Sequence, residues 1–241
     1  LHVSGNLARA QGDYTAAERL YQDCLTLRRR LDDTHGIAGA LHNLGIIAYE
    51  RGEYEGAAAL LTEALAGIRR TGDSYGIAFH LATLGDISRA RGDPAARECY
   101  QESLTLFRQI EHRWGIALVL ASLGDAEREQ GRYGLATAYY QESLALNQQV
   151  GDYRAAAQSL EGLALLAREA DSTLAVRLFS AAAALRDRLN APRPPIAQPA
   201  YDQAITLLRQ RLGADGFASA WATGQAMALD DILDLAGGVS A

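Results

Sequence analysis

The sequence predicts an all-α protein in which five helical hairpins stack into one solenoid that ends in a helical cap. The first observation is a Leu-x-x-Leu-Gly motif that returns about every 40 residues, at Leu41, Leu81 and Leu120. The second is composition, because alanine and leucine are abundant while aromatic residues make up only 7%, which favours helix over sheet. The third is that a lone hairpin cannot bury both apolar faces, so repeated hairpins must stack.

The first helix of each hairpin carries this motif. A weaker copy begins at Leu160, and a truncated one covers residues 1–5. Gly45, Gly85 and Gly124 each follow a leucine that we expect to be buried. A residue without a side chain at that position lets a neighbouring helix come close, so we predict close helix crossings at these glycines.

The second helix of each hairpin begins after a turn glycine and carries small, large and small residues at spacings of four and three. These spacings place the three residues on one stripe of a helix. The turn glycines are Gly12, Gly52, Gly92 and Gly131. The stripes are Ala17/Tyr21/Cys24, Ala57/Leu61/Ala64, Ala96/Tyr100/Ser103, Ala136/Tyr140/Ser143 and Ala175/Phe179/Ala182.

These marks divide residues 1–190 into repeats 1–35, 36–75, 76–114, 115–153 and 154–190. First helices are predicted near 36–51, 76–91, 115–130 and 154–169, with a partial one at 1–11. Second helices are predicted near 14–31, 54–71, 94–110, 133–149 and 172–190.

The remaining chain departs from the repeat. Residues 191–199 contain four prolines, which predicts a stiff connector, and residues 200–241 are predicted to form the helical cap. Within the cap we expect one helix over 201–212, a break at Gly213 and Gly216, and two further short helices. A solenoid needs such a cap over its last apolar face.

The repeated motifs resemble the tetratricopeptide repeat, with leucine in place of its usual tryptophan, no closing proline and a longer period. The resemblance implies a right-handed superhelical solenoid whose first helices line a concave groove. It also implies a protein-binding role.

Charge and motif content exclude several other functions. The net charge is −6, which disfavours nucleic acid and anionic membrane as partners. All 23 basic residues are arginine, so the lysine of a nucleotide-binding phosphate loop is missing. No metal-ligand or nucleophile motif occurs. We therefore expect a cytoplasmic binding module that is not an enzyme and has no cofactor or metal.

The candidate binding residues are those on first helices that point away from the predicted buried stripe. In the second repeat they are His42, Asn43, Ile46 and Tyr49, and in the third Phe79, Thr83, Asp86 and Arg89. In the fourth they are Leu118, Ser122, Asp125 and Arg128, and in the fifth Glu161 and Arg168.

Arginine recurs once per repeat among these residues, and Asp86 and Asp125 precede Arg89 and Arg128 by three positions. One interpretation is a set of surface ion pairs, each worth about 0.2–0.5 kcal/mol. The other is a ladder of guanidinium donors beside apolar side chains, suited to an extended peptide or a helix. The sequence leaves both open.

The C-terminal part adds a second resemblance, carried by residues 178–186, 188–195 and 216–224 with Tyr201 between them. These segments resemble the end of the sensor arm in bacterial signal-transduction ATPases and LuxR-type transcription factors. The resemblance implies an arm that binds a protein, a peptide segment or a small effector and biases a switch. The alternative is a generic adaptor without a switching role. The uncapped N-terminal repeat is also a candidate homodimer contact.

Overall fold

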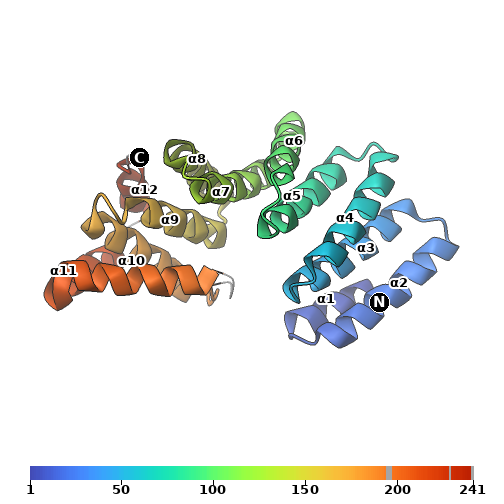
Figure 1. Cartoon of the computed structure of the whole chain (residues 1–241), viewed down its shortest axis with the longest axis horizontal. Helices are drawn as coiled ribbons and strands as arrows, with labels where there is room; N and C mark the ends of the chain where they lie inside the picture. The colour runs from blue at the N-terminus through green and yellow to red at the C-terminus, as the bar shows by residue number, and fades with distance from the viewer. Residues whose placement is uncertain (194–196, 228, 240–241) are drawn as a thin grey trace. The chain divides into compact units, whose positions relative to one another are not determined.

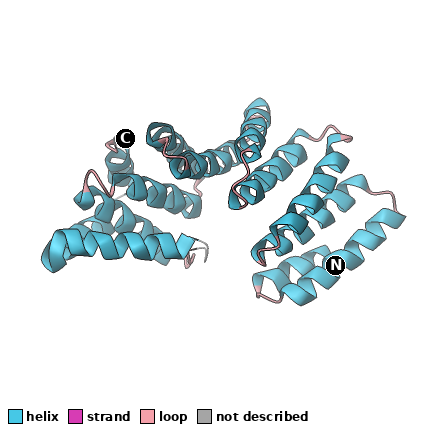
Figure 2. Ribbon diagram, viewed as in Figure 1, coloured by secondary structure: helices cyan, strands magenta, loops and turns pink. Residues whose placement is uncertain are grey.

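The structure, a computed structural model, describes residues 1–193, 197–227 and 229–239, and the side chains of Ala10, Leu229, Asp230 and Leu233 are not described. Over these residues it contains helices and turns but no strand (Figure 2). The helices are α1 (His2–Ala10), α2 (Tyr14–Arg30), α3 (Thr34–Glu50), α4 (Tyr54–Arg69), α5 (Ser74–Ala90), α6 (Ala95–Gln109), α7 (Arg113–Glu129), α8 (Tyr133–Val150), α9 (Tyr153–Ala167), α10 (Ser172–Arg188), α11 (Gln198–Ala226) and α12 (Leu229–Gly237).

Consecutive helices pack as five antiparallel hairpins, which confirms the predicted fold class (Figure 1). The predicted ends of the repeat helices agree with α1 to α10 to within about two residues. Most hairpin units begin at an aspartate whose carboxylate accepts a backbone N–H of the first turn, as Asp33 does from Gly36 at 2.9 Å and Asp73 does at 3.0 Å. Such caps satisfy N–H groups that a helix start leaves without partners.

The chain divides into two compact units, Leu1–His112 and Arg113–Ala241. The first unit contains α1 to α6, with a core that includes Tyr21, Leu41 and Leu81. The second contains α7 to α12, and its core includes Tyr140 and Phe179. The repeat pattern of the sequence runs across residue 112 without a change.

The motif glycines lie at close crossings between the helices of a hairpin. A Cβ atom added to Gly85 would lie 2.5 Å from Cε1 of Tyr100, and one added to Gly124 would lie 2.6 Å from Cε1 of Tyr140. The rings of Tyr100 and Tyr140 are fully buried. Because the ring occupies the space of the missing side chain, the leucine-glycine motif and the second-helix ring form one packing unit.

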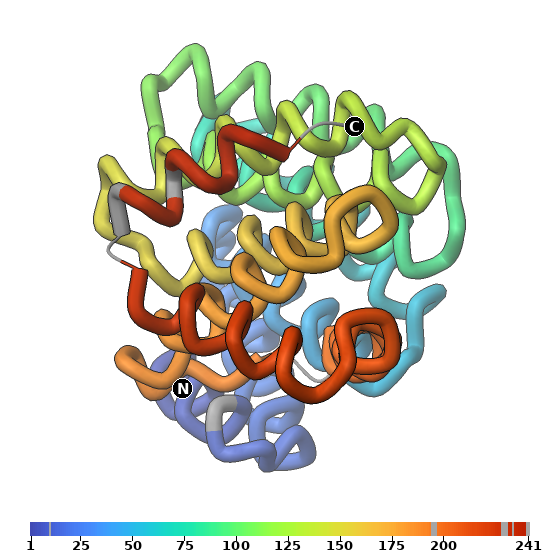
Figure 3. Tube along the Cα trace, turned by 90° about the vertical axis from the view of Figure 1, so that its left-hand side faces the viewer, coloured from blue at the N-terminus to red at the C-terminus, as the bar shows by residue number. Residues whose placement is uncertain are grey.

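The C-terminal helices pack on the last hairpin. Figure 3 shows α11 and α12, in orange to red, running along the helices of this part of the chain. Gly213 has φ 68° and ψ 175° and kinks α11, as predicted, whereas Gly216 continues the helix. The connector is shorter than predicted, since α11 begins at Gln198 and Pro199 lies in its first turn, a position that proline favours. Pro194 and Pro195 lie outside the described residues.

We expect Gly224→Ala to weaken the attachment of α11 to α10 by about 1–3 kcal/mol, because overpacking forces the backbones apart. A Cβ atom at Gly224 would meet Ser180 Oγ and the carbonyl oxygen of Arg177, and would lie 2.8 Å from Arg177 Cα. Urea unfolding followed by tryptophan fluorescence measures the loss. Gly216→Ala is the matched control in the same helix, since its nearest neighbour lies at 3.4 Å. Equal stability of the two variants would contradict the assigned contact.

Candidate protein-binding site

Of the fourteen candidate binding residues, twelve are half-buried. His42 and Glu161 are instead buried. In the first unit the half-buried residues are Asn43, Ile46 and Tyr49 on α3 and Phe79, Thr83, Asp86 and Arg89 on α5. In the second unit they are Leu118, Ser122, Asp125 and Arg128 on α7 and Arg168, which directly follows α9.

The acidic residues of this set accept hydrogen bonds from core tyrosines. The Tyr100 hydroxyl donates to Asp86 at 2.7 Å, and the Tyr140 hydroxyl donates to Asp125 at 2.7 Å. Burial, followed by the charge of Asp86, raises the pKa of the Tyr100 hydroxyl, which therefore stays protonated and donates. Asp86 and Asp125 thus bind the core tyrosine of their own repeat, a role that neither interpretation from the sequence included.

The residue that follows the last position of the Leu-x-x-Leu-Gly motif and the large residue of the second helix change together from repeat to repeat. Tyr21 of the first repeat donates to Asn6 at 2.5 Å, so all three tyrosines at this position have an acceptor. Where the second helix has Leu61, the acceptor position holds Ile46. Where it has Phe179, that position holds Leu165. A hydroxyl on one helix is therefore matched by an oxygen on the other, a signal that was visible in the sequence.

Aromatic rings of α3 and α5 stack on one another in the first unit. The ring of Phe79 lies 5.0 Å from that of His42, and Tyr75 stacks on Phe79 at 6.3 Å. Burial, reinforced by the charges of His80 and Arg9, lowers the pKa of His42 to about 3, so its ring is neutral. His42 is therefore part of the packing beneath this surface, while Tyr75 and Phe79 present its accessible rings.

A pocket of about 260 Å³ lies in the second unit, beside the ends of α7 and α9. It is lined by Arg128, Tyr133, Leu165, Leu166, Arg168, Glu169 and Ala170. Two predicted arginines therefore meet at one depression with an exposed tyrosine and apolar side chains. Arg128 also lies near the Tyr140 hydroxyl, with Nε 3.4 Å from the oxygen. The pocket combines guanidinium donors with apolar side chains, so it suits a ligand that carries both a hydrogen-bond acceptor and an apolar group.

Glu161 belongs to an internal ion cluster. Its carboxylate accepts hydrogen bonds from Arg186 Nε and Nη2, both at 2.9 Å, and from Arg193 at 2.8 and 2.9 Å. Only 8% of the residue is exposed. We therefore leave Glu161 out of the proposed binding surface, although the repeat pattern placed it there.

Two searches of the described residues concern metal ligands and membrane-spanning helices. No group of three or more histidine, cysteine or acidic side chains is arranged to hold an ion there. Cys24 and Cys99 are both free thiols. Among these residues no helix has the length and apolar character that crossing a bilayer requires.

The fold and its repeated contacts define a helical repeat protein. The sequence pattern of the tetratricopeptide repeat family matches residues 1–70 and 76–149. The chain therefore belongs to the tetratricopeptide repeat family, and protein binding is the general role of such repeats.

Individual relatives give a further comparison. A stretch of 92 residues is 36% identical to proteins of Mycobacterium bovis and Mycobacterium tuberculosis, each named "Putative HTH-type transcriptional regulator". The match covers 38% of this chain and 10% of each relative, so the chain matches only a small part of these proteins. Among solved structures, BtubC from P. vanneervenii has a TM-score of 0.66 and 21% identity, with 79% of this chain and 80% of that chain covered. The latter similarity concerns the fold.

Proposed function

We propose that this chain is the partner-binding arm of a larger bacterial transcriptional regulator, and that the pocket at Arg128, Tyr133, Leu165 and Arg168 receives a segment of the partner. The observation that carries the proposal is this pocket, because it gathers two of the recurring arginines and apolar side chains on one unit. The family supports binding of a protein, and the partial relatives support a regulatory setting.

The chemistry of the pocket favours a short peptide with an acidic and an apolar residue near each other. Guanidinium groups hold carboxylates through paired hydrogen bonds, which an apolar surface alone cannot do. Leu165 and Leu166 offer contact area for an aliphatic or aromatic side chain. Glu169 also lines the pocket; its carboxylate accepts from Arg211 Nη2 at 2.5 Å and lies 3.4 Å from Arg168 Nε. Arg128 Nη2 lies 3.6 Å from Asp125, so a carboxylate of the partner would compete with these longer pairs for both pocket arginines.

Peptides selected from a displayed random library against the 241-residue chain test this proposal. We expect the selected peptides to share an acidic residue beside an apolar one. In the chain carrying Arg128→Ala and Arg168→Ala, their affinity should fall at least tenfold while circular dichroism stays unchanged. The control combines Arg19→Ala and Arg30→Ala, two exposed arginines of α2. Equal affinity for both variants would refute the pocket as the binding site.

The alternative is an adaptor that assembles proteins without switching anything. A longer protein that contains this chain separates the two functions, through a transcriptional reporter measured with and without the two pocket substitutions. A regulator arm requires the reporter output to change when peptide binding is lost. An adaptor leaves the output unchanged.

A further inference from the structure

The ion cluster around Glu161 carries more positive than negative charge. Arg186 from α10 and Arg193, which follows α10, both donate to the same carboxylate of α9. Their side chains are 7% and 10% exposed, so water screens them little. Among the described residues a single carboxylate therefore pairs with two buried guanidinium groups, which leaves one positive charge without a paired carboxylate there.

Each arginine also keeps a poorly used nitrogen. Nη1 of Arg186 lies 3.5 Å from the carbonyl oxygen of Pro192, and Nη1 of Arg193 lies 3.4 Å from Oε1 of Gln198. Both distances exceed the usual range for such bonds. The guanidinium of Arg193 lies 3.4 Å from the centre of the Tyr201 ring, a contact that favours the charge but satisfies none of its in-plane donors.

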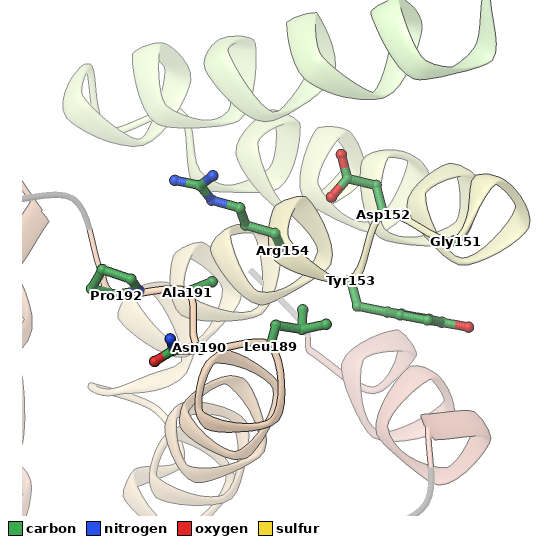
Figure 4. Close-up of a pocket in the computed structure, with 8 residues that line it drawn as sticks. All are labelled: Gly151, Asp152, Tyr153, Arg154, Leu189, Asn190, Ala191 and Pro192. Carbon is green, nitrogen blue, oxygen red and sulfur yellow. The ribbon is translucent and has the colours of Figure 1, made fainter. Parts of the chain in front are cut away.

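Both arginines line an open pocket of about 510 Å³, together with Asn190, Pro192 and Tyr201. The turn at Asn190–Pro192 also forms a wall of a second pocket of about 320 Å³ (Figure 4). Figure 4 shows the side chain of Arg154 extending above Ala191 and Pro192 in this view. Arg154 forms no ion pair with any residue that the structure describes.

We propose that the pocket beside Arg186 and Arg193 binds an oxyanion, the carboxylate or phosphate group of a small molecule. An anion there would balance the remaining charge and give Nη1 of both arginines short, charge-assisted hydrogen bonds. The proposal concerns a different place from the peptide pocket at Arg128 and Arg168, and it holds whether or not that pocket binds a partner.

One negative group opposes such a ligand. Asp187 lines the same pocket and is exposed, and no ion pair holds it within the described residues. Its charge weakens the attraction for an anion without contributing to the buried cluster. The neighbouring Arg188 is exposed as well and does not line the pocket. These two residues supply a test that leaves Glu161, Arg186 and Arg193 intact.

The test follows the arginine Nε–Hε resonances of the 241-residue chain by NMR while inorganic phosphate or succinate is added at constant ionic strength. We expect saturable shifts of the Arg186 and Arg193 signals. Comparing the two titrations shows which oxyanion binds more tightly. In Asp187→Asn the half-saturation concentration should fall about threefold or more, because a like charge is removed from the pocket. In Arg188→Gln it should change by less than twofold.

The competing explanation is that both arginines only fasten residues 191–193 to the last hairpin. That explanation predicts shifts that rise linearly with anion concentration, as for weak surface association. It also predicts the same curves for Asp187→Asn and the unmodified chain. Either result would overturn the proposed site.

Discussion

Replacing Glu161 with alanine is expected to lower the free energy of unfolding of the second unit by about 3–5 kcal/mol, since the change leaves two guanidinium groups buried without a counter-charge. No other carboxylate lies within 4.0 Å of Arg186 or Arg193 among the described residues. Trp114 and Trp221, the two tryptophans of the sequence, both lie in this unit. Tryptophan fluorescence during urea unfolding therefore reports its stability.

Glu169→Ala provides the control for this prediction. Glu169 also pairs with arginine, but 59% of its side chain is exposed, so its loss should cost no more than about 1 kcal/mol. A loss at Glu161 as small as the loss at Glu169 would show that Arg186 and Arg193 find other partners or water. That outcome would remove the ion cluster as a stabilising feature.

Tyr100→Leu is expected to destabilise the first unit by about 2–4 kcal/mol, because it removes a fully buried ring and leaves Asp86 without the Tyr100 hydroxyl. Adding Asp86→Ile should recover about 1–2 kcal/mol, since the pair then matches Leu61 and Ile46 of the preceding repeat. Urea unfolding followed by circular dichroism gives the four free energies of the cycle.

The same substitution at an exposed tyrosine is the control for this cycle. Tyr133 is 54% exposed, and Tyr133→Leu should change stability by less than about 0.5 kcal/mol. If Tyr100→Leu and Asp86→Ile simply add in the double variant, the hydroxyl and the carboxylate act independently. The paired reading of these positions would then be wrong.

The repeat motifs were sufficient to predict the hairpins because they mark which side of each helix is buried. Gly85 and Gly124 could be assigned to close crossings from their place after a leucine, and the structure puts a tyrosine ring over each. The turn glycines marked where second helices begin. The periodic pattern contains no sign of the division after His112, because the repeat continues through it.

The candidate site was predicted less completely. Periodicity gives the direction in which a side chain leaves its helix, but not how far a long side chain from another element reaches. Arg193 pairs with Glu161 across 32 residues of sequence, from a segment outside the repeat, so the pattern placed Glu161 on an open surface. Tyr140 likewise passes beside Gly124 and reaches Asp125, which changes the role of that carboxylate.

The link between Tyr140 and Asp125 constrains how such repeats can diverge. A substitution at Asp125 removes the hydrogen-bond acceptor of the buried Tyr140 hydroxyl. Such a change affects folding stability whether or not it also affects ligand binding, so selection for stable folding constrains this position. Leu118 lies on the same helix, is half-buried and receives no such hydroxyl. Leu118 can therefore change singly without removing the partner of a buried hydroxyl, whereas Asp125 and Tyr140 are expected to change together.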